Sequence, residues 1–83
     1  MLETVLKALD IYNKYHSPES KAELLKIEDN KIYIKFEGIF CKSCGVYDWI
    51  EDFKYILEEF NIKTELEIIE KDNYFIGIFK IIE

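Results

Sequence analysis

The sequence predicts one α+β domain, a two-layer sandwich in which two helices cover one face of a sheet of about four strands. Two observations support this fold class. Apolar residues recur with the 3.6-residue period of an amphipathic helix in two segments, and each such segment precedes two stretches with the two-residue period of a half-buried strand. The expected order over residues 1–83 is therefore α-β-β-α-β-β.

The first helix is expected over residues 2–15, where apolar residues such as Val5 and Leu9 recur at helical spacing and charged residues fill the opposite side. It should end near Pro18, because proline disfavours helix at the residue before it. A hairpin should follow. In its first strand Leu25 and Ile27 alternate with charged residues, and the turn falls at residues 29–30.

The second strand of this hairpin is expected over residues 31–37, in the sequence KIYIKFE, with Ile32, Ile34 and Phe36 on its apolar face. The second helix should span residues 46–59. It carries the strongest apolar stripe in the chain, and we expect Trp49 and Phe53 to meet Phe36 in the core. Its stripe consists of Val46, Trp49, Ile50, Phe53, Leu57 and Phe60.

The C-terminal part supplies two further strands, over residues 64–70 and 74–82, joined by a turn at residues 71–73. No repeat, linker or low-complexity segment divides the chain. The core of the expected sandwich should include Ile50 and Leu57 packed on the apolar face of residues 31–37.

Composition excludes several functions. The chain has 17 acidic and 11 basic residues, a formal net charge of -6, and lysines spread singly rather than in a patch, so we expect no nucleic-acid binding. The N-terminal sequence MLETVLKALD lacks the basic flank and apolar run of a signal peptide. No segment approaches the roughly 18 apolar residues of a membrane span. We expect a cytoplasmic protein with no membrane association.

The two cysteines of the chain, Cys41 and Cys44, lie together in the sequence FEGIFCKSCGVYDW. In a reducing cytoplasm such a pair is more often a metal site or a redox pair than a structural disulfide. The pair stands between an expected strand and an expected helix, where the positive end of the helix dipole favours thiolate, and Lys42 adds a positive charge. The spacing permits a shared metal ion, a reversible disulfide or a single nucleophilic sulfur, and it selects none of them.

Two thiolates are half of a tetrahedral sulfur site. The other ligands would come from His16, from an acid such as Glu37 or Asp48, from a bound partner or from a second copy of the chain. His16 also has a simpler interpretation, as a helix-end residue that interacts favourably with the dipole. The acids Asp48, Glu51 and Asp52 are typical of a first helical turn, so we assign no catalytic residue.

Most of the chain resembles the NifU C-terminal domain, an iron-sulfur cluster scaffold and carrier. The resemblance rests on VLKALDIY, on LLKIEDNKIYIKFEGIFCKSC and on IEDFKYILEEFNIKTELEII. It implies a cluster held by Cys41 and Cys44 between two copies, hence a homodimer at least when metal is bound, with client or donor proteins. GIFCKSC is also similar to the loop of heavy-metal-associated domains, which carry copper(I), and more weakly to TusA-type sulfur carriers.

The leading hypothesis is a domain that uses Cys41 and Cys44 to bind an iron-sulfur cluster or a soft metal ion, zinc or copper(I), for assembly or delivery. We do not expect it to turn over a substrate. The first alternative is a thiol redox partner or sulfur carrier that uses the same two cysteines. The second is an interaction domain whose cysteines are inert.

Overall fold

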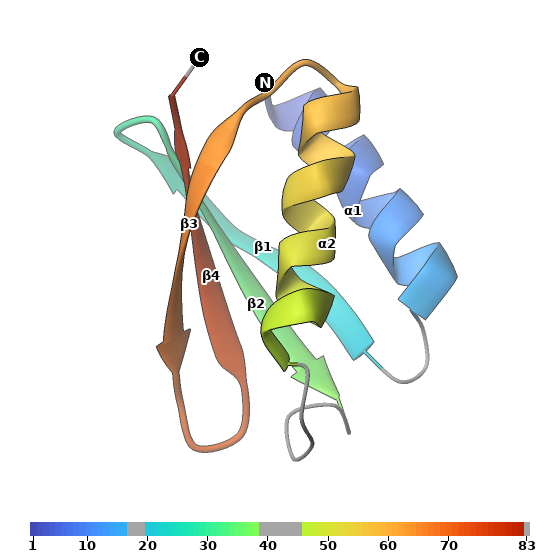
Figure 1. Cartoon of the computed structure of the whole chain (residues 1–83), viewed down its shortest axis with the longest axis vertical. Coiled ribbons are helices and arrows are strands. Elements are labelled where there is room, and N and C mark those ends of the chain that lie inside the picture. The colour runs from blue at the N-terminus through green and yellow to red at the C-terminus, as the bar shows by residue number, and fades with distance from the viewer. Residues whose placement is uncertain (17–19, 39–45, 83) are drawn as a thin grey trace.

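The computed structural model describes residues 1–16, 20–38 and 46–82, and it confirms the α+β fold and the order α-β-β-α-β-β (Figure 1). Two helices lie on one face of a four-stranded sheet, as expected. Element boundaries agree closely with the sequence prediction except at the first strand. The elements are α1 (Leu2–His16), β1 (Ser20–Glu28), β2 (Lys31–Gly38), α2 (Val46–Glu59), β3 (Thr64–Glu70) and β4 (Phe75–Ile81).

The strands are arranged in the order β1-β2-β4-β3, and every neighbouring pair is antiparallel. Because β4 pairs with both β2 and β3, these two strands run parallel to each other, and α2 forms the crossover between them. The β1–β2 turn places Asp29 and Asn30 at φ values of 54° and 61°, the left-handed backbone that a two-residue hairpin turn requires.

The end of α2 is capped by its own backbone. The amide of Ile62 donates to the carbonyl of Leu57 at 3.0 Å, and the amide of Asn61 donates to that of Glu58 at 2.9 Å. Asn61 takes a φ of 66°, so these bonds form the motif in which a left-handed residue stops a helix. Ile62 and Leu57 are both buried, which ties the end of α2 to the core.

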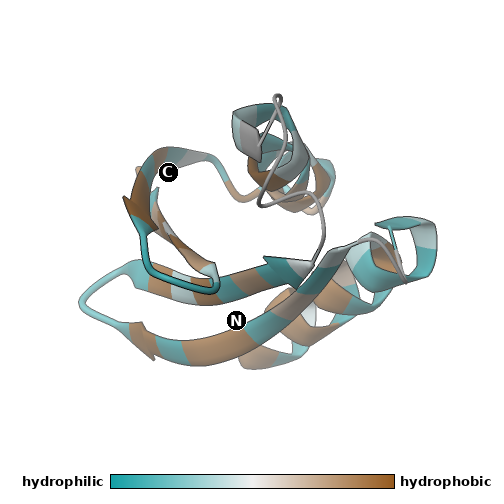
Figure 2. Ribbon diagram, turned by 90° about the horizontal axis from the view of Figure 1, so that it is seen from below, coloured by the Kyte–Doolittle hydropathy of each residue, from teal (hydrophilic) through white to brown (hydrophobic). Residues whose placement is uncertain are grey.

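Between the helices and the sheet lies a core built around aromatic rings. Apolar and polar residues alternate along the strands, as the banded ribbon of Figure 2 shows. Phe36, Phe53 and Phe79 are fully buried, with ring centroids 6.3 Å apart for Phe36–Phe53 and 5.1 Å for Phe53–Phe79. Tyr12 of α1 reaches the same cluster, 5.4 Å from Phe36. Edge-to-face pairs of this kind stabilise a core beyond the area that they bury.

The core residues expected from the sequence are confirmed for Phe36, Ile50, Phe53 and Leu57, and Trp49 differs from the expectation. The contact of Phe36 with Phe53 is present, and Ile50 and Leu57 of α2 are fully buried. Trp49 packs against the cluster while remaining partly exposed, so it lies at the margin of the core.

The first strand corrects the sequence prediction. It begins at Ser20 instead of Leu25, and the β1–β2 register shifts between Leu24 and Lys26. This bulge turns Leu25 outward, leaving it 46% exposed, whereas Leu24 and Ile27 pack against the core. The expectation that Leu25 and Ile27 share one face was wrong because an inserted residue shifts a two-residue period by one.

Gly77 allows α2 to approach the middle of the sheet. A Cβ at this position would lie 2.9 Å from the ring of Phe79, 3.0 Å from that of Phe36 and 3.2 Å from Cγ2 of Ile50. The first distance is too short for two carbon atoms and the other two are tight, so a side chain here would force the rings or Ile50 to shift. A glycine inside a strand is typical of such a close approach.

We therefore expect Gly77→Ala to lower the free energy of unfolding by about 1–3 kcal/mol, the usual cost of overpacking a core. Chemical denaturation followed by far-ultraviolet circular dichroism measures it. Ile76→Thr, on the same strand but on the outward face, is the control and should cost less than about 1 kcal/mol. Equal denaturation midpoints for Gly77→Ala and the unmodified chain would contradict this account of the helix contact.

Candidate functional site

Cys41 and Cys44 lie in residues 39–45, outside the part of the chain that the structure describes. The described residues on either side are Gly38, the last of β2, and Val46, the first of α2. Gly38 has a φ of 148°, which residues with a Cβ rarely adopt. The glycine before the cysteines thus has a structural reason, because the chain leaves the sheet there in a conformation that favours glycine.

The end of the sheet where β2 stops is held by a buried hydrogen bond. Gly38 pairs with Ser20, the first residue of β1. The hydroxyl of Ser20 is 3.0 Å from that of Tyr12, and both residues are fully buried. A paired polar contact in a core fixes geometry, since either hydroxyl left alone would lose its partner without regaining water. The last turns of α1 are therefore tied to the strand end from which the cysteine segment departs.

Asn13 makes a second tie between α1 and β1. Its Oδ1 accepts a hydrogen bond from the amide of Ala22 at 2.7 Å, and its Nδ2 donates to the carbonyl of the same residue at 3.0 Å. β1 is an edge strand, whose unpaired backbone groups need partners. One side chain thus satisfies both groups of Ala22 and fixes α1 along this edge.

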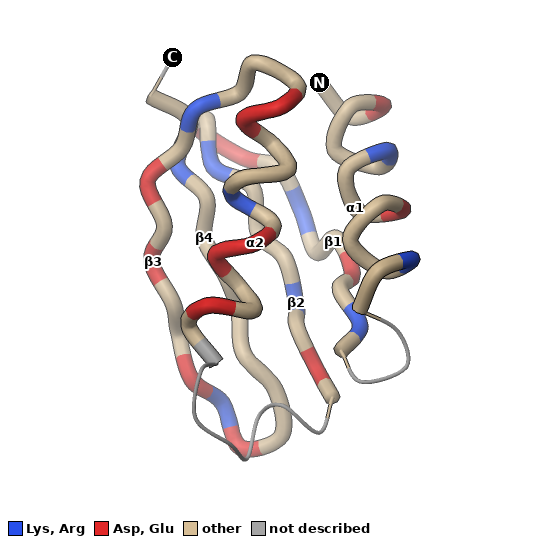
Figure 3. Tube along the Cα trace, turned by 45° about the vertical axis from the view of Figure 1, so that its right-hand side comes forward, with Lys and Arg blue, Asp and Glu red and all other residues tan. Residues whose placement is uncertain are grey.

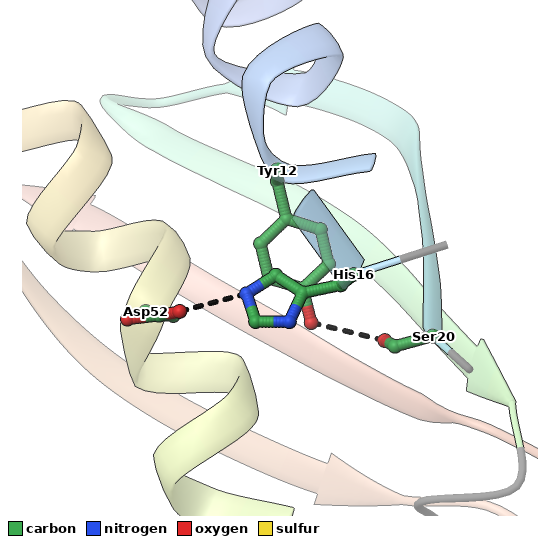
Figure 4. Close-up of polar contacts among 4 residues, drawn as sticks. All are labelled: Tyr12, His16, Ser20 and Asp52. Carbon is green, nitrogen blue, oxygen red and sulfur yellow. Dashed lines mark hydrogen bonds and ion pairs between the residues drawn. The ribbon is translucent and has the colours of Figure 1, made fainter. Parts of the chain in front are cut away.

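His16 joins the two helices. Its Nε2 lies 2.7 Å from Oδ2 of Asp52, and the side chains are 19% and 50% exposed, respectively (Figure 4). The imidazole ring packs between Tyr12, at a centroid distance of 4.4 Å, and Trp49, at 5.0 Å. α1 and α2 run in opposite directions, so the C-terminal end of one meets the N-terminal half of the other (Figure 1).

The prediction that His16 is a helix-end residue is confirmed, since α1 ends there. Its pairing with Asp52 was missed by sequence reasoning. The two residues are 36 positions apart, and no local pattern links them. The sequence predicted Asp52 in the acidic first turn of this helix. In the structure the first turn of α2 contains Asp48, and Asp52 lies one turn later.

The other acids considered as metal ligands do not gather around His16. Glu37 lies beside Lys35 on β2, with Oε2 and Nζ 3.8 Å apart, on the face of the sheet opposite the helices. Asp48 is exposed on α2. In residues 1–16, 20–38 and 46–82, no group of three or more histidines, cysteines, aspartates or glutamates could hold a metal ion.

His16 and Asp52 border an open groove between the helices, with a volume of about 620 Å³. Ile11 and Tyr15 of α1 and Ile56 of α2 form much of its wall. A histidine–carboxylate pair can orient a general base, but that chemistry also needs a nucleophile within hydrogen-bond reach of the imidazole. The bond to Asp52 and the ring contact with Trp49 join His16 of α1 to α2, so these contacts hold the two helices together.

No protein-family model, curated protein or solved structure matches the chain. Neither helix in the described residues has the length and apolar character needed to cross a membrane. What the chain does is therefore inferred from its own residues and geometry.

We expect His16→Ala to lower the free energy of unfolding by about 1–3 kcal/mol, because it removes a ring packed between Tyr12 and Trp49 as well as the bond to Asp52. Asp52→Ala should cost less, about 0.5–1 kcal/mol, since a half-exposed pair is screened by water. Urea denaturation of the three proteins at neutral pH measures both values.

The matched control is Glu58→Ala, which removes a second ion pair of α2. Glu58 accepts a hydrogen bond from Lys54 at 3.2 Å, and this bond raises the pKa of Lys54 above its usual value. Such a pair within one helix contributes about 0.3–0.5 kcal/mol. If Asp52→Ala were as harmful as His16→Ala, packing of the imidazole ring would not be the main contribution.

Proposed function

We propose that this chain carries an iron-sulfur cluster or a soft metal ion on Cys41 and Cys44, for assembly or delivery, in the reducing environment of the cytoplasm. The metal is cargo, and the chain turns over no substrate. The resemblance of its sequence to the NifU C-terminal domain points in the same direction.

One observation carries the proposal. β2 ends at Gly38 and α2 begins at Val46, so Cys44 stands two residues before a helix of 14 residues. The first amides of a helix have no intrahelical partner, and the positive end of its dipole favours negative charge. Thiolate is the form of cysteine that binds soft metals, and such a junction favours it.

The described part of the chain supports a site whose base is fixed. Ser20 pairs with Gly38 and is held by Tyr12, and the start of α2 is held by Ile50 over Gly77. A segment with both ends anchored loses less conformational entropy on binding a ligand than a free one would.

The ligand count favours two chains. Each chain offers two thiolates, whereas zinc-sulfur sites and ordinary iron-sulfur clusters use four. The described residues contribute no further set of ligands. We therefore propose a symmetric pair in which each copy contributes Cys41 and Cys44, while copper(I) would need only the thiolates of one chain.

We expect at least one of the two thiols to react with iodoacetamide at neutral pH faster than free cysteine does, because a helix N-terminus lowers the pKa of a nearby thiol. Cys41→Ser and Cys44→Ser assign the reaction to one position, and mass spectrometry measures its rate. Labelling of both thiols that is slow in the folded protein and fast after denaturation would support inert cysteines.

Anaerobic reconstitution tests the binding itself. We expect one cluster, or one zinc ion, per two chains, and a mass that doubles on loading, because four sulfurs are required. Cys44→Ser should lose both. Trp49, the only tryptophan, follows Cys44 by five residues, so its fluorescence should change on loading and report binding independently of colour.

Each outcome separates the candidates. Suppose that each chain binds one full complement of metal, that its mass does not change on loading, and that Cys44→Ser binds as much metal as the unmodified chain. These results together would show that Cys44 is not a ligand. A reversible disulfide without metal binding would favour the redox or sulfur-carrier alternative. Neither activity would leave an interaction domain with inert cysteines.

A further inference from the structure

The face of the sheet opposite the helices is not covered by any described part of the chain. It mixes partly exposed apolar residues, Ile76 and Ile78 on β4 and Tyr33 on β2, with charged residues of both signs. Figure 3 shows acidic and basic residues spread along the strands. A shallow hollow of about 330 Å³ opens on this side near Lys31, Ile78 and Lys80.

Charge distinguishes this face from the rest of the molecule. The chain carries a net charge of -6, and much of this charge lies on α2 (Figure 3). This helix contains one lysine, Lys54, and five acidic residues, Asp48, Glu51, Asp52, Glu58 and Glu59. On the open face, in contrast, both signs are present: lysines and glutamates alternate on β1, lysines prevail on β2 and glutamates on β3. Two copies meeting through this face would therefore keep their acidic helices on the outside, where self-repulsion is smallest.

We infer that the open face binds the same face of a second copy, about a two-fold axis that lies in the plane of the interface, perpendicular to the strands. The axis passes over the row of paired residues Leu24, Ile34, Gly77 and Ile68. It lays each strand against its own equivalent in the opposite direction, as an isologous interface requires.

The outward residues of β1 are self-complementary about this axis. The charged ones are Lys21, Glu23, Lys26 and Glu28, and the bulge, where Leu25 also points outward, keeps the last two on the outward side. Reversal of the strand places Lys21 opposite Glu28 of the second copy and Glu23 opposite Lys26 of the second copy. Both contacts join opposite charges, which favours this orientation over others.

β2 follows the same rule. Its outward residues are Lys31, Tyr33, Lys35 and Glu37. Reversal places Lys31 opposite Glu37 of the second copy and Lys35 opposite Tyr33 of the second copy. Lysines already lie over tyrosine rings on this face, with Lys26 4.7 Å from the centroid of Tyr33, so the same cation–π contact can form between copies.

The apolar centre comes from β4, where Ile76 would face Ile78 of the second copy. On β3, Glu67 would face Ile69, which is 36% exposed. An axis along the strands would instead place Lys31 opposite Lys80, two like charges. The charge pattern therefore selects the antiparallel arrangement, in which sheets stack at about 10 Å with their strands nearly aligned.

The size of the face predicts a weak dimer. Four strands of about seven residues, spaced by about 4.8 Å with a rise of about 3.3 Å per residue, give a footprint of roughly 450 Å² per copy. Specific interfaces bury about 1,200 Å² or more in total, so this one falls near or below the lower limit. Association should depend on concentration in the micromolar to millimolar range.

This dimer is independent of metal and differs from the pair in the proposed function. Because β2 runs from Lys31 to Gly38, reversal places Gly38 of one copy towards the Asp29–Asn30 turn of the other. The strand ends that lead into the cysteine segments therefore point to opposite ends of the assembly. The dimer is tested with the reduced, metal-free protein in the presence of a chelator. If no dimer forms under these conditions, the proposal that Cys41 and Cys44 bind metal is not affected.

The experiment is a charge swap between molecules, followed by sedimentation velocity. Glu23→Lys places a second positive charge opposite Lys26 of the second copy, and Lys26→Glu places a second negative charge opposite Glu23 of the second copy. Each variant alone should therefore dimerise about tenfold or more weakly than the unmodified chain. An equimolar mixture of the two should dimerise again, because opposite charges then meet across the interface.

Two further variants complete the test, and circular dichroism checks that all of them fold. Ile78→Lys should abolish association by burying an unpaired charge against Ile76 of the second copy, at the apolar centre. Leu6→Lys, on a 48% exposed residue of α1, should leave it unchanged. A monomer at millimolar concentration, a mixture no more associated than its components, or an effect of Leu6→Lys equal to that of Ile78→Lys would overturn the inference.

Discussion

The contact between α2 and the middle of the sheet is the constraint on which the rest of this structure depends. Gly77 leaves the space of a Cβ to the rings of Phe36 and Phe79 and to Ile50, so the helix can lie close to the central strands. The backbone motif at Asn61 fixes where the helix ends, and Ile62 and Leu57 bury that end. With one contact and one end determined, the position of Val46 at the start of α2 follows.

The second anchor of the cysteine segment comes from α1. Tyr12, Asn13 and His16, in the last turns of this helix, contact Ser20, Ala22 and Asp52, respectively. These contacts connect the helix to β1 and to α2 at the end of the sheet where β2 stops. Among the described residues, three polar contacts thus lie near the end of the sheet at which β2 stops, before the segment with Cys41 and Cys44.

The periodic elements could be predicted from the sequence because burial on one face leaves a direct record in residue spacing. Both helices, the paired strands and the core contact of Phe36 with Phe53 follow from it. The bulge beside Leu25 could not be predicted, because SKAEL carries little strand propensity and an inserted residue reverses the pattern after it. Gly77 alone would be interpreted as a weak point of its strand, and its role becomes visible only when α2 is seen above it.

The site divides in the same way. The cysteine pair and its place between strand and helix were evident, since they depend on neighbours in sequence. The pairing of His16 with Asp52 was not, since it depends on how two helices pack over 36 intervening positions. The strand order, with β4 between β2 and β3, also depends on long-range pairing. Which charged residues would face each other in the dimer inferred above follows only from the register of the paired strands.

The central claim is that Cys41 and Cys44 bind a soft metal through sulfur ligands from two chains. X-ray absorption at the metal edge of the zinc-loaded protein tests it most directly, because it counts the atoms bound to the metal. The account predicts four sulfur neighbours at about 2.3 Å and no nitrogen or oxygen ligand. A first shell dominated by nitrogen or oxygen at about 2.0–2.2 Å would contradict it.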